Sequence, residues 1–146
     1  MIRLTMAFAM LAAAPGWASL DAAKAEPNLE KRSGLALDNA TRALQSARDA
    51  YLAQGDMKQV GASLLEVSAS VELAYDSLLQ THKIPSRSPK YFKKAEIETR
   101  GLLRRIDDLR EQMSVDDRDA LEKVRAVVQK VHESLLEGIM GGEKKE

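Results

Sequence analysis

Two histidines, His82 and His132, are the side chains best suited to metal or acid–base chemistry in this sequence of 146 residues, which contains no cysteine. The lack of cysteine excludes disulfides, thiolate zinc sites and cysteine nucleophiles. A zinc or copper site takes about four ligands, so both histidines would need about two further side chains beside them. Glu30 and Glu133 are acidic candidates, but no H-x-x-x-H or E-x-x-H pair places two ligands on one helix face. We therefore predict no metal site and expect His132 to flank the core of a helix.

Arg125 and His132 lie seven residues apart in the stretch RAVVQKVH. This interval returns to the same face of a helix after two turns, so the two side chains could share a phosphate. The pattern resembles the R-x6-H motif of HEPN ribonucleases, which are helical bundles that act on cytoplasmic RNA. The resemblance implies an RNA-cleaving site at Arg125 and His132, and this is one alternative function.

His132 also lies in the last long helical segment of the sequence. A histidine there resembles the haem ligand of periplasmic b-type cytochromes that fold as four-helix bundles, which implies haem binding at His132. The second ligand of those cytochromes is a methionine early in the first helix, and no methionine lies between Asp21 and Asp56. A metal- or haem-binding bundle that uses His132 is the other alternative.

The remaining polar clusters do not predict an enzyme. The sequence contains no G-x-S-x-G nucleophile motif and no glycine-rich phosphate loop. Asp107 and Asp108 are adjacent, as are Asp116 and Asp117, and adjacent helical side chains point about 100° apart rather than toward each other. Acids in a first helical turn also complement the helix dipole. We predict a non-catalytic protein without a cofactor.

Charge is distributed unevenly along the chain. The 22 basic and 22 acidic side chains cancel overall, which gives no electrostatic reason to expect nucleic acid as a partner. Eight basic and two acidic residues lie between Lys83 and Arg105, whereas seven acidic and two basic residues lie between Ile106 and Glu122. The basic strip is either a solvated face or a contact surface for an envelope protein, anionic lipid or cell-wall polymer. The predicted binding residues are Lys90, Tyr91, Lys93, Lys94, Arg100 and Arg104.

Residues 1–18 have the order of regions found in a secretory signal peptide. Arg3 precedes an uncharged run at 4–14, and small residues precede a cleavage site after Ala18. The run is shorter than the ~20 residues that span a bilayer, so we expect no transmembrane segment in the mature form. A second candidate cleavage site follows Ala25. The sequence predicts a periplasmic or secreted protein.

Sparse glycine and proline leave four long segments, at about 28–54, 56–80, 89–113 and 114–140. Each repeats an apolar residue in steps of four and three, which is typical of helices that cross at about 20°. The predicted core stripes are Ser33, Leu37, Ala40, Leu44, Ala47 and Tyr51; Val60, Leu64, Val67, Val71, Ala74 and Leu78; Phe92, Ala95, Thr99, Leu102, Ile106, Leu109 and Met113; and Leu121, Val124, Val128, Val131 and Leu135.

The fold class we predict is all-α, an antiparallel up-down-up-down four-helix bundle over 28–140. We expect a flexible segment at 19–27 and a disordered charged tail at 141–146, and we expect the loop at 81–88 to join neighbouring helices. A homodimer of two long helical hairpins is the alternative architecture. The expected helix boundaries are Gly55 in a left-handed C-cap, and Asp56, Ser88 and Ser114 as N-caps.

Overall fold

The computed structural model describes residues 19–141 and shows an all-helical protein, with no strand in that part of the chain. The predicted signal peptide and the end of the predicted tail, after residue 141, lie outside the described residues. The elements are α1 (Leu20–Ala25), α2 (Leu29–Leu52), α3 (Met57–Gln80), α4 (Lys90–Gln112), the 3-10 turn η1 (Val115–Asp117) and α5 (Asp119–Ile139). The predicted helical bundle and its four long helices are confirmed.

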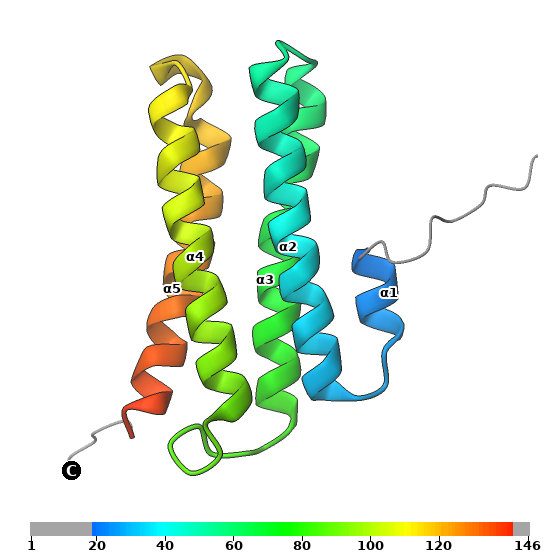
Figure 1. Cartoon of the computed structure of the whole chain (residues 1–146), viewed down its shortest axis with the longest axis vertical. Coiled ribbons are helices and arrows are strands. Elements are labelled where there is room, and N and C mark those ends of the chain that lie inside the picture. The colour runs from blue at the N-terminus through cyan, green and yellow to red at the C-terminus, as the bar shows by residue number, and fades with distance from the viewer. Residues whose placement is uncertain (1–18, 142–146) are drawn as a thin grey trace, which may run out of the picture.

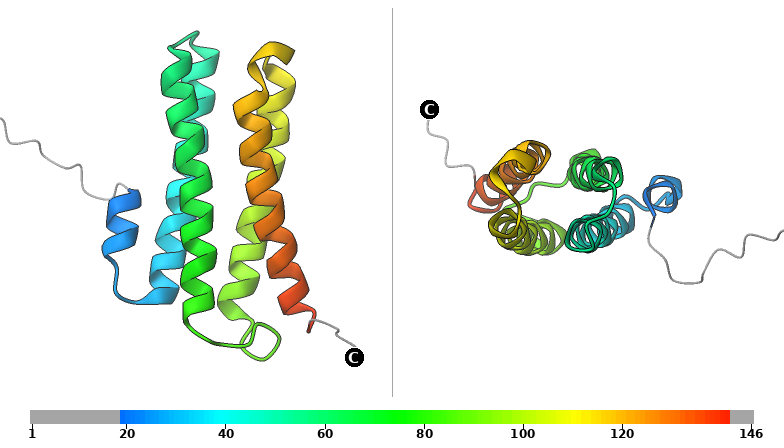
Figure 2. Two further views of the ribbon diagram at one scale, coloured as in Figure 1. Left: turned by 180° about the vertical axis from the view of Figure 1, so that it is seen from behind. Right: turned by 90° about the horizontal axis from the view of Figure 1, so that it is seen from above.

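The four long helices form two hairpins, α2–α3 and α4–α5, which stand side by side (Figures 1 and 2). Successive helices run in opposite directions, α2 lies beside α4, and α3 lies beside α5. Helices α3 and α4 therefore lie across the diagonal, so the expectation that the middle loop joins neighbours is wrong. The loop at 81–89 instead crosses one end of the bundle, which we call the loop end. The opposite end, where both hairpins turn, is the turn end.

The predicted stripes form the core. Every stripe residue is buried except Tyr51, which is half-buried. Phe92 is the only aromatic side chain that is fully buried in the described residues, so the core consists mainly of Leu, Val, Ile and Ala. The sequence stripe did not predict a second buried face between α2 and α3, which consists of Ala36, Asn39, Ala43, Ser70 and Ser77.

These small residues bring α2 and α3 close together. Asn39, which is 1% exposed, donates its amide N–H groups to Ser70 Oγ at 2.9 Å and to Glu66 Oε2 at 3.0 Å. The two bonds satisfy both protons of a buried amide, which would otherwise be costly to remove from water. The first hairpin is therefore held by close packing together with one buried polar contact.

Residues 20–25 form a helix where we expected a flexible segment. The Ser19 hydroxyl accepts a hydrogen bond from the Ala22 N–H at 3.0 Å and caps α1, and Ala23 is completely buried where α1 packs on the first hairpin. The Arg32 guanidinium donates to the Glu26 carbonyl at 2.8 Å and fixes the connection to α2. A helix of six residues is too short to show a periodic pattern, which is why the sequence did not predict it.

The turn between α2 and α3 differs from the prediction by one residue. Gln54, not Gly55, has the left-handed conformation, with φ of 55°. The Gly55 N–H donates to the Ala50 carbonyl at 2.8 Å, and a Cβ at residue 55 would lie 2.9 Å from that same oxygen. Glycine is thus required for close approach rather than for a positive φ. Asp56 caps α3 as predicted, accepting from the Lys58 N–H at 2.9 Å.

The two other predicted caps are wrong. Pro89, which has no side chain able to accept a hydrogen bond, stands at the N-cap of α4 in place of Ser88. Ser114 precedes the 3-10 turn η1 rather than α5, and its hydroxyl donates to Asp117 Oδ2 at 2.9 Å. The last helix therefore begins four residues later than expected, with Arg118 at its N-cap and Asp119 as its first residue.

The turn ends of the two hairpins are joined by Tyr51. Its hydroxyl donates to Asp117 Oδ2 at 3.0 Å and accepts from the Ser114 N–H at 3.0 Å. The two bonds connect the end of α2 to the segment between α4 and α5. We call this contact the tyrosine clamp.

Tyr51→Phe removes the clamp while leaving the ring in place. A hydrogen bond at a partly exposed site is worth about 1 kcal/mol, so the free energy of unfolding should fall by about that amount in urea titrations. Tyr75→Phe is the matched control, because Tyr75 is equally half-buried but its hydroxyl makes no hydrogen bond with a described residue. An equal effect of the two substitutions would contradict a stabilising role for the clamp.

Candidate binding surface

The basic strip predicted from the sequence lies on α4, whose core face is formed by Phe92, Ala95, Thr99 and Leu102. All six predicted residues are exposed: Lys90, Tyr91, Lys93, Lys94, Arg100 and Arg104. The Lys90 ammonium lies 5.1 Å from the centre of the Tyr91 ring, within the range of a cation–π contact. The structure thus leaves the predicted residues accessible.

The six residues do not form a single continuous strip. Tyr91 and Lys94 line a groove of about 380 Å³ between α2 and α4, opposite Gly34 and Asp38. A Cβ at residue 34 would lie 3.9 Å from the Lys94 ammonium, an ordinary van der Waals distance, so the groove would also accommodate an alanine there. The six predicted residues fall into a groove group and an outer group because α4 packs beside α2, a pairing that the sequence does not predict.

The other side of the strip faces outward from the bundle. Lys93, Arg100 and Arg104 follow the spacing of one helix face, opposite the core stripe. Arg100 forms an ion pair with Glu96, one turn earlier, at 3.0 Å. This pair compensates part of the positive charge, so Lys93 and Arg104 are the more effective cations on the outer side.

The structure adds residues that the prediction left out. Ile97 lies on the outer side between Lys93 and Arg104, and its side chain is 58% exposed. Ile84, in the crossing loop, is 49% exposed. The signal for Ile97 was its position outside the apolar stripe, because an isoleucine there has no partner in the core.

The crossing loop contributes basic residues to the same end of the molecule. Lys83 and Arg87 are exposed in the loop that leads into α4, and Lys83 forms an ion pair with Glu30 at 2.9 Å. We call the combined region the loop-end surface. It consists of the cations Lys83, Arg87, Lys90, Lys93 and Lys94 and the exposed apolar side chains Ile84, Tyr91 and Ile97.

The cations of the loop-end surface are mostly uncompensated. Within residues 19–141, Arg87, Lys90, Lys93 and Lys94 make no ion pair, and Lys83 makes the one with Glu30. Positive charge without an internal partner attracts anions from solution. The region therefore has the charge expected of a surface that binds an anionic partner.

Two carboxylates lie at the seam between α2 and α4, Asp38 on α2 and Glu98 on α4, and their negative charge counters part of the positive charge. Glu98 is half-buried, and this burial raises its pKa. Asp38 on α2 raises the pKa of Glu98 further, whereas Lys94 and Arg105 act in the opposite direction. Helices α2 and α4 therefore meet along a seam that is less favourable when Glu98 is ionised.

Glu98→Gln tests this seam. The folded protein holds the Glu98 proton more tightly than the unfolded chain, so the contribution of Glu98 to stability falls as pH rises from its ordinary pKa through the raised one. The glutamine variant should lose that part of the pH dependence and should be more stable than wild type at neutral pH. Urea titrations across this pH range measure the effect, with Glu111→Gln, an exposed site on the same helix, as the control. A glutamine variant that weakens with rising pH as much as wild type would contradict the account.

His132 is held by the helix beside it. Its Nδ1 lies 3.1 Å from Thr99 Oγ1, and the same hydroxyl lies 2.9 Å from the Ala95 carbonyl and 3.0 Å from the Glu96 carbonyl. The Thr99 hydroxyl thus bridges the His132 ring on α5 and the backbone of α4. Thr99 is fully buried, so this contact sets the orientation of the histidine.

His82 lies in the crossing loop, exposed and in a left-handed conformation with φ of 57°. Residues 19–141 contain no group of three or more His, Asp or Glu side chains positioned to hold a metal ion. The structure therefore brings no set of ligands to either histidine in this part of the chain.

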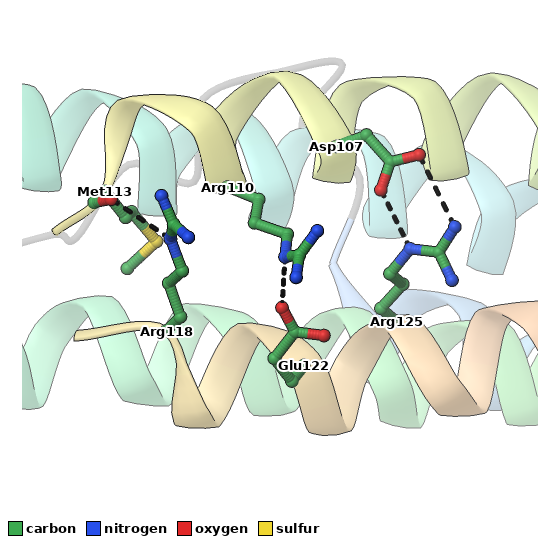
Figure 3. Close-up of polar contacts among 6 residues, drawn as sticks. All are labelled: Asp107, Arg110, Met113, Arg118, Glu122 and Arg125. Carbon is green, nitrogen blue, oxygen red and sulfur yellow. Dashed lines mark hydrogen bonds and ion pairs between the residues drawn. The ribbon is translucent and has the colours of Figure 1, made fainter. Parts of the chain in front are cut away.

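Arg125 faces α4 as well, two turns before His132. Its Nε donates to Asp107 Oδ1 at 2.8 Å, with a weaker second contact between Nη2 and Oδ2 at 3.5 Å (Figure 3). The hydrogen bond to Asp107 raises the pKa of the guanidinium. A phosphate would have to compete with Asp107 for Arg125, so the spacing of the R-x6-H pattern is explained here by contacts between helices.

Two more arginines complete the row that joins α4 to α5 (Figure 3). Arg110 forms an ion pair with Glu122, and Arg118 Nε donates to the Met113 carbonyl at 3.1 Å. Together with Asp107 and Arg125, these contacts place a line of polar bonds along the outer seam of the second hairpin. The contacts of Arg125 and Arg110 link the two helices, and that of Arg118 links the two ends of the turn between them.

Comparisons with protein-family models, with curated proteins and with solved structures give no match to this chain. None of the helices within 19–141 is long and apolar enough to cross a membrane. Any function proposed for the protein therefore rests on its own surface and sequence.

Proposed function

We propose that this chain is an exported, non-catalytic protein that binds an anionic component of the cell envelope through the basic N-terminal half of α4. The observation that carries the proposal is the group of exposed cations at the loop end, four of which make no ion pair with a described residue. Anionic lipid, an acidic envelope protein or a cell-wall polymer would supply the missing counter-charge.

The proposal that the protein is exported rests on its N-terminal sequence. The regions of the predicted signal peptide are followed at once by Ser19, whose hydroxyl caps α1. Cleavage after Ala18 would leave α1 intact, whereas cleavage after Ala25 would remove the buried side chain of Ala23. On this proposal cleavage follows Ala18, because it leaves α1 intact, and the mature protein begins at Ser19 in the periplasm or outside the cell.

The binding residues on this proposal are Lys90, Lys93 and Lys94, with Tyr91 as an aromatic contact and Arg104 extending the charge. Lysine and arginine supply attraction over distance, and tyrosine adds contact area at a small entropic cost. The protein needs no cofactor for this function. A homodimer would be compatible with it, provided that the loop end stays accessible.

Charge reversal at these lysines tests the proposal. A variant with Lys90→Glu, Lys93→Glu and Lys94→Glu should move from the envelope fraction to the soluble fraction, while circular dichroism shows unchanged helicity. The control carries Lys58→Glu, Lys123→Glu and Lys130→Glu, which change the net charge equally at exposed positions on α3 and α5. The control should fractionate as wild type, and intact mass of the same samples should give Ser19 as the first residue. A first variant that stays with the envelope would overturn the proposal.

A further inference from the structure

We propose that the loop-end surface binds the face of an anionic lipid bilayer, with Ile84 and Ile97 entering the interface between the head groups and the acyl chains. This inference rests on the proposed function and names its partner. It separates lipid from the acidic proteins and polymers that positive charge alone would also attract.

Exposed apolar side chains among the cations carry the inference. Ile84 is 49% exposed, Ile97 is 58% exposed and Tyr91 is 36% exposed, and each lies in the loop or the first three turns of α4 with the uncompensated lysines. A soluble polyanion would leave these side chains in water and gain nothing from them. A bilayer offers both anionic head groups and an apolar layer just beneath them, and tyrosine is enriched at that boundary.

The outer side of α4 has a geometry that suits a flat surface. Ile97 follows Lys93 by four residues and precedes Arg104 by seven, so the three side chains share one face of the helix. They span about 16 Å along the axis at ~1.5 Å per residue. Lysine and arginine can direct their charged groups to phosphates while Ile97 reaches farther in.

Acidic residues limit how much of α4 makes the contact. Asp108 and Glu111 lie beyond Arg104, where they line a groove between α4 and α2, and both are exposed. An anionic surface would repel these carboxylates, so the protein should meet the bilayer with its loop end and keep the turn end in water. The crossing loop then lies against the bilayer, which brings Ile84 to the interface.

The contributions of the basic and the apolar side chains to membrane binding can each be estimated. Each basic residue near an anionic surface strengthens binding by about fivefold, and each buried isoleucine by about tenfold. Neither contribution alone gives tight binding, so the charged and apolar groups must act together. Binding should consequently weaken with added salt but should not be abolished by it.

The test measures binding of the purified mature protein to three probes. They are vesicles of phosphatidylglycerol and phosphatidylcholine in equal amounts, vesicles of phosphatidylcholine alone, and soluble polyphosphate as a polyanion without an apolar part. The apolar variant carries Ile84→Gln and Ile97→Gln. Its control is Leu65→Gln, because Leu65 on α3 is 72% exposed and lies outside the loop-end surface. The charge variant is the lysine triple substitution described above.

We expect wild type and Leu65→Gln to bind the mixed vesicles and to bind phosphatidylcholine vesicles far more weakly. The apolar variant should bind the mixed vesicles at least tenfold more weakly, with its binding to polyphosphate unchanged. Equal binding of mixed vesicles by the apolar variant and wild type would overturn the lipid inference while leaving the proposed function standing. If the charge variant binds both anionic probes as wild type does, the proposed function fails as well.

Discussion

The close approach of α2 and α3 is the contact on which the rest of the structure depends. With one fully buried aromatic ring among the described residues, the core cannot fill wide spaces between helices, so helices must pack through small side chains. Ala36, Ala43, Ser70 and Ser77 allow this in the first hairpin, and the buried Asn39 amide donates to Ser70 across the contact. The second hairpin lacks such a face and is joined by arginine contacts along its outer seam instead.

The way in which the hairpins pair determines where the candidate surface lies. Because α2 packs beside α4, Tyr91 and Lys94 line a groove while Lys93 and Arg104 face outward. Because α3 and α4 lie across the diagonal, the connecting loop crosses the end of the bundle and brings Lys83 to the start of α4. A bundle with neighbouring α3 and α4 would not need this crossing.

The sequence predicts the long helices and their core well, because periodic apolar residues report burial directly. It does not predict α1, whose six residues are too few for a period, or the α2–α3 face, because the polar residues Asn39, Ser70 and Ser77 interrupt any apolar pattern there. The diagonal path of the loop between α3 and α4 depends on which faces of the two hairpins pack together. No local sequence pattern indicates that choice. The basic strip was visible as composition, but its division between groove and outer face, and the role given to Ile97, required the three-dimensional packing.

A tryptophan at residue 97 would test the membrane contact most directly. The only tryptophan of the sequence is Trp17, which precedes the proposed cleavage site, so Ile97→Trp would give the mature protein a single tryptophan, on the proposed surface. On binding vesicles that contain phosphatidylglycerol, its emission should shift to the blue, and lipids brominated near the head groups should quench it. Bound protein whose tryptophan emission stays that of a water-exposed indole, without quenching, would contradict the account.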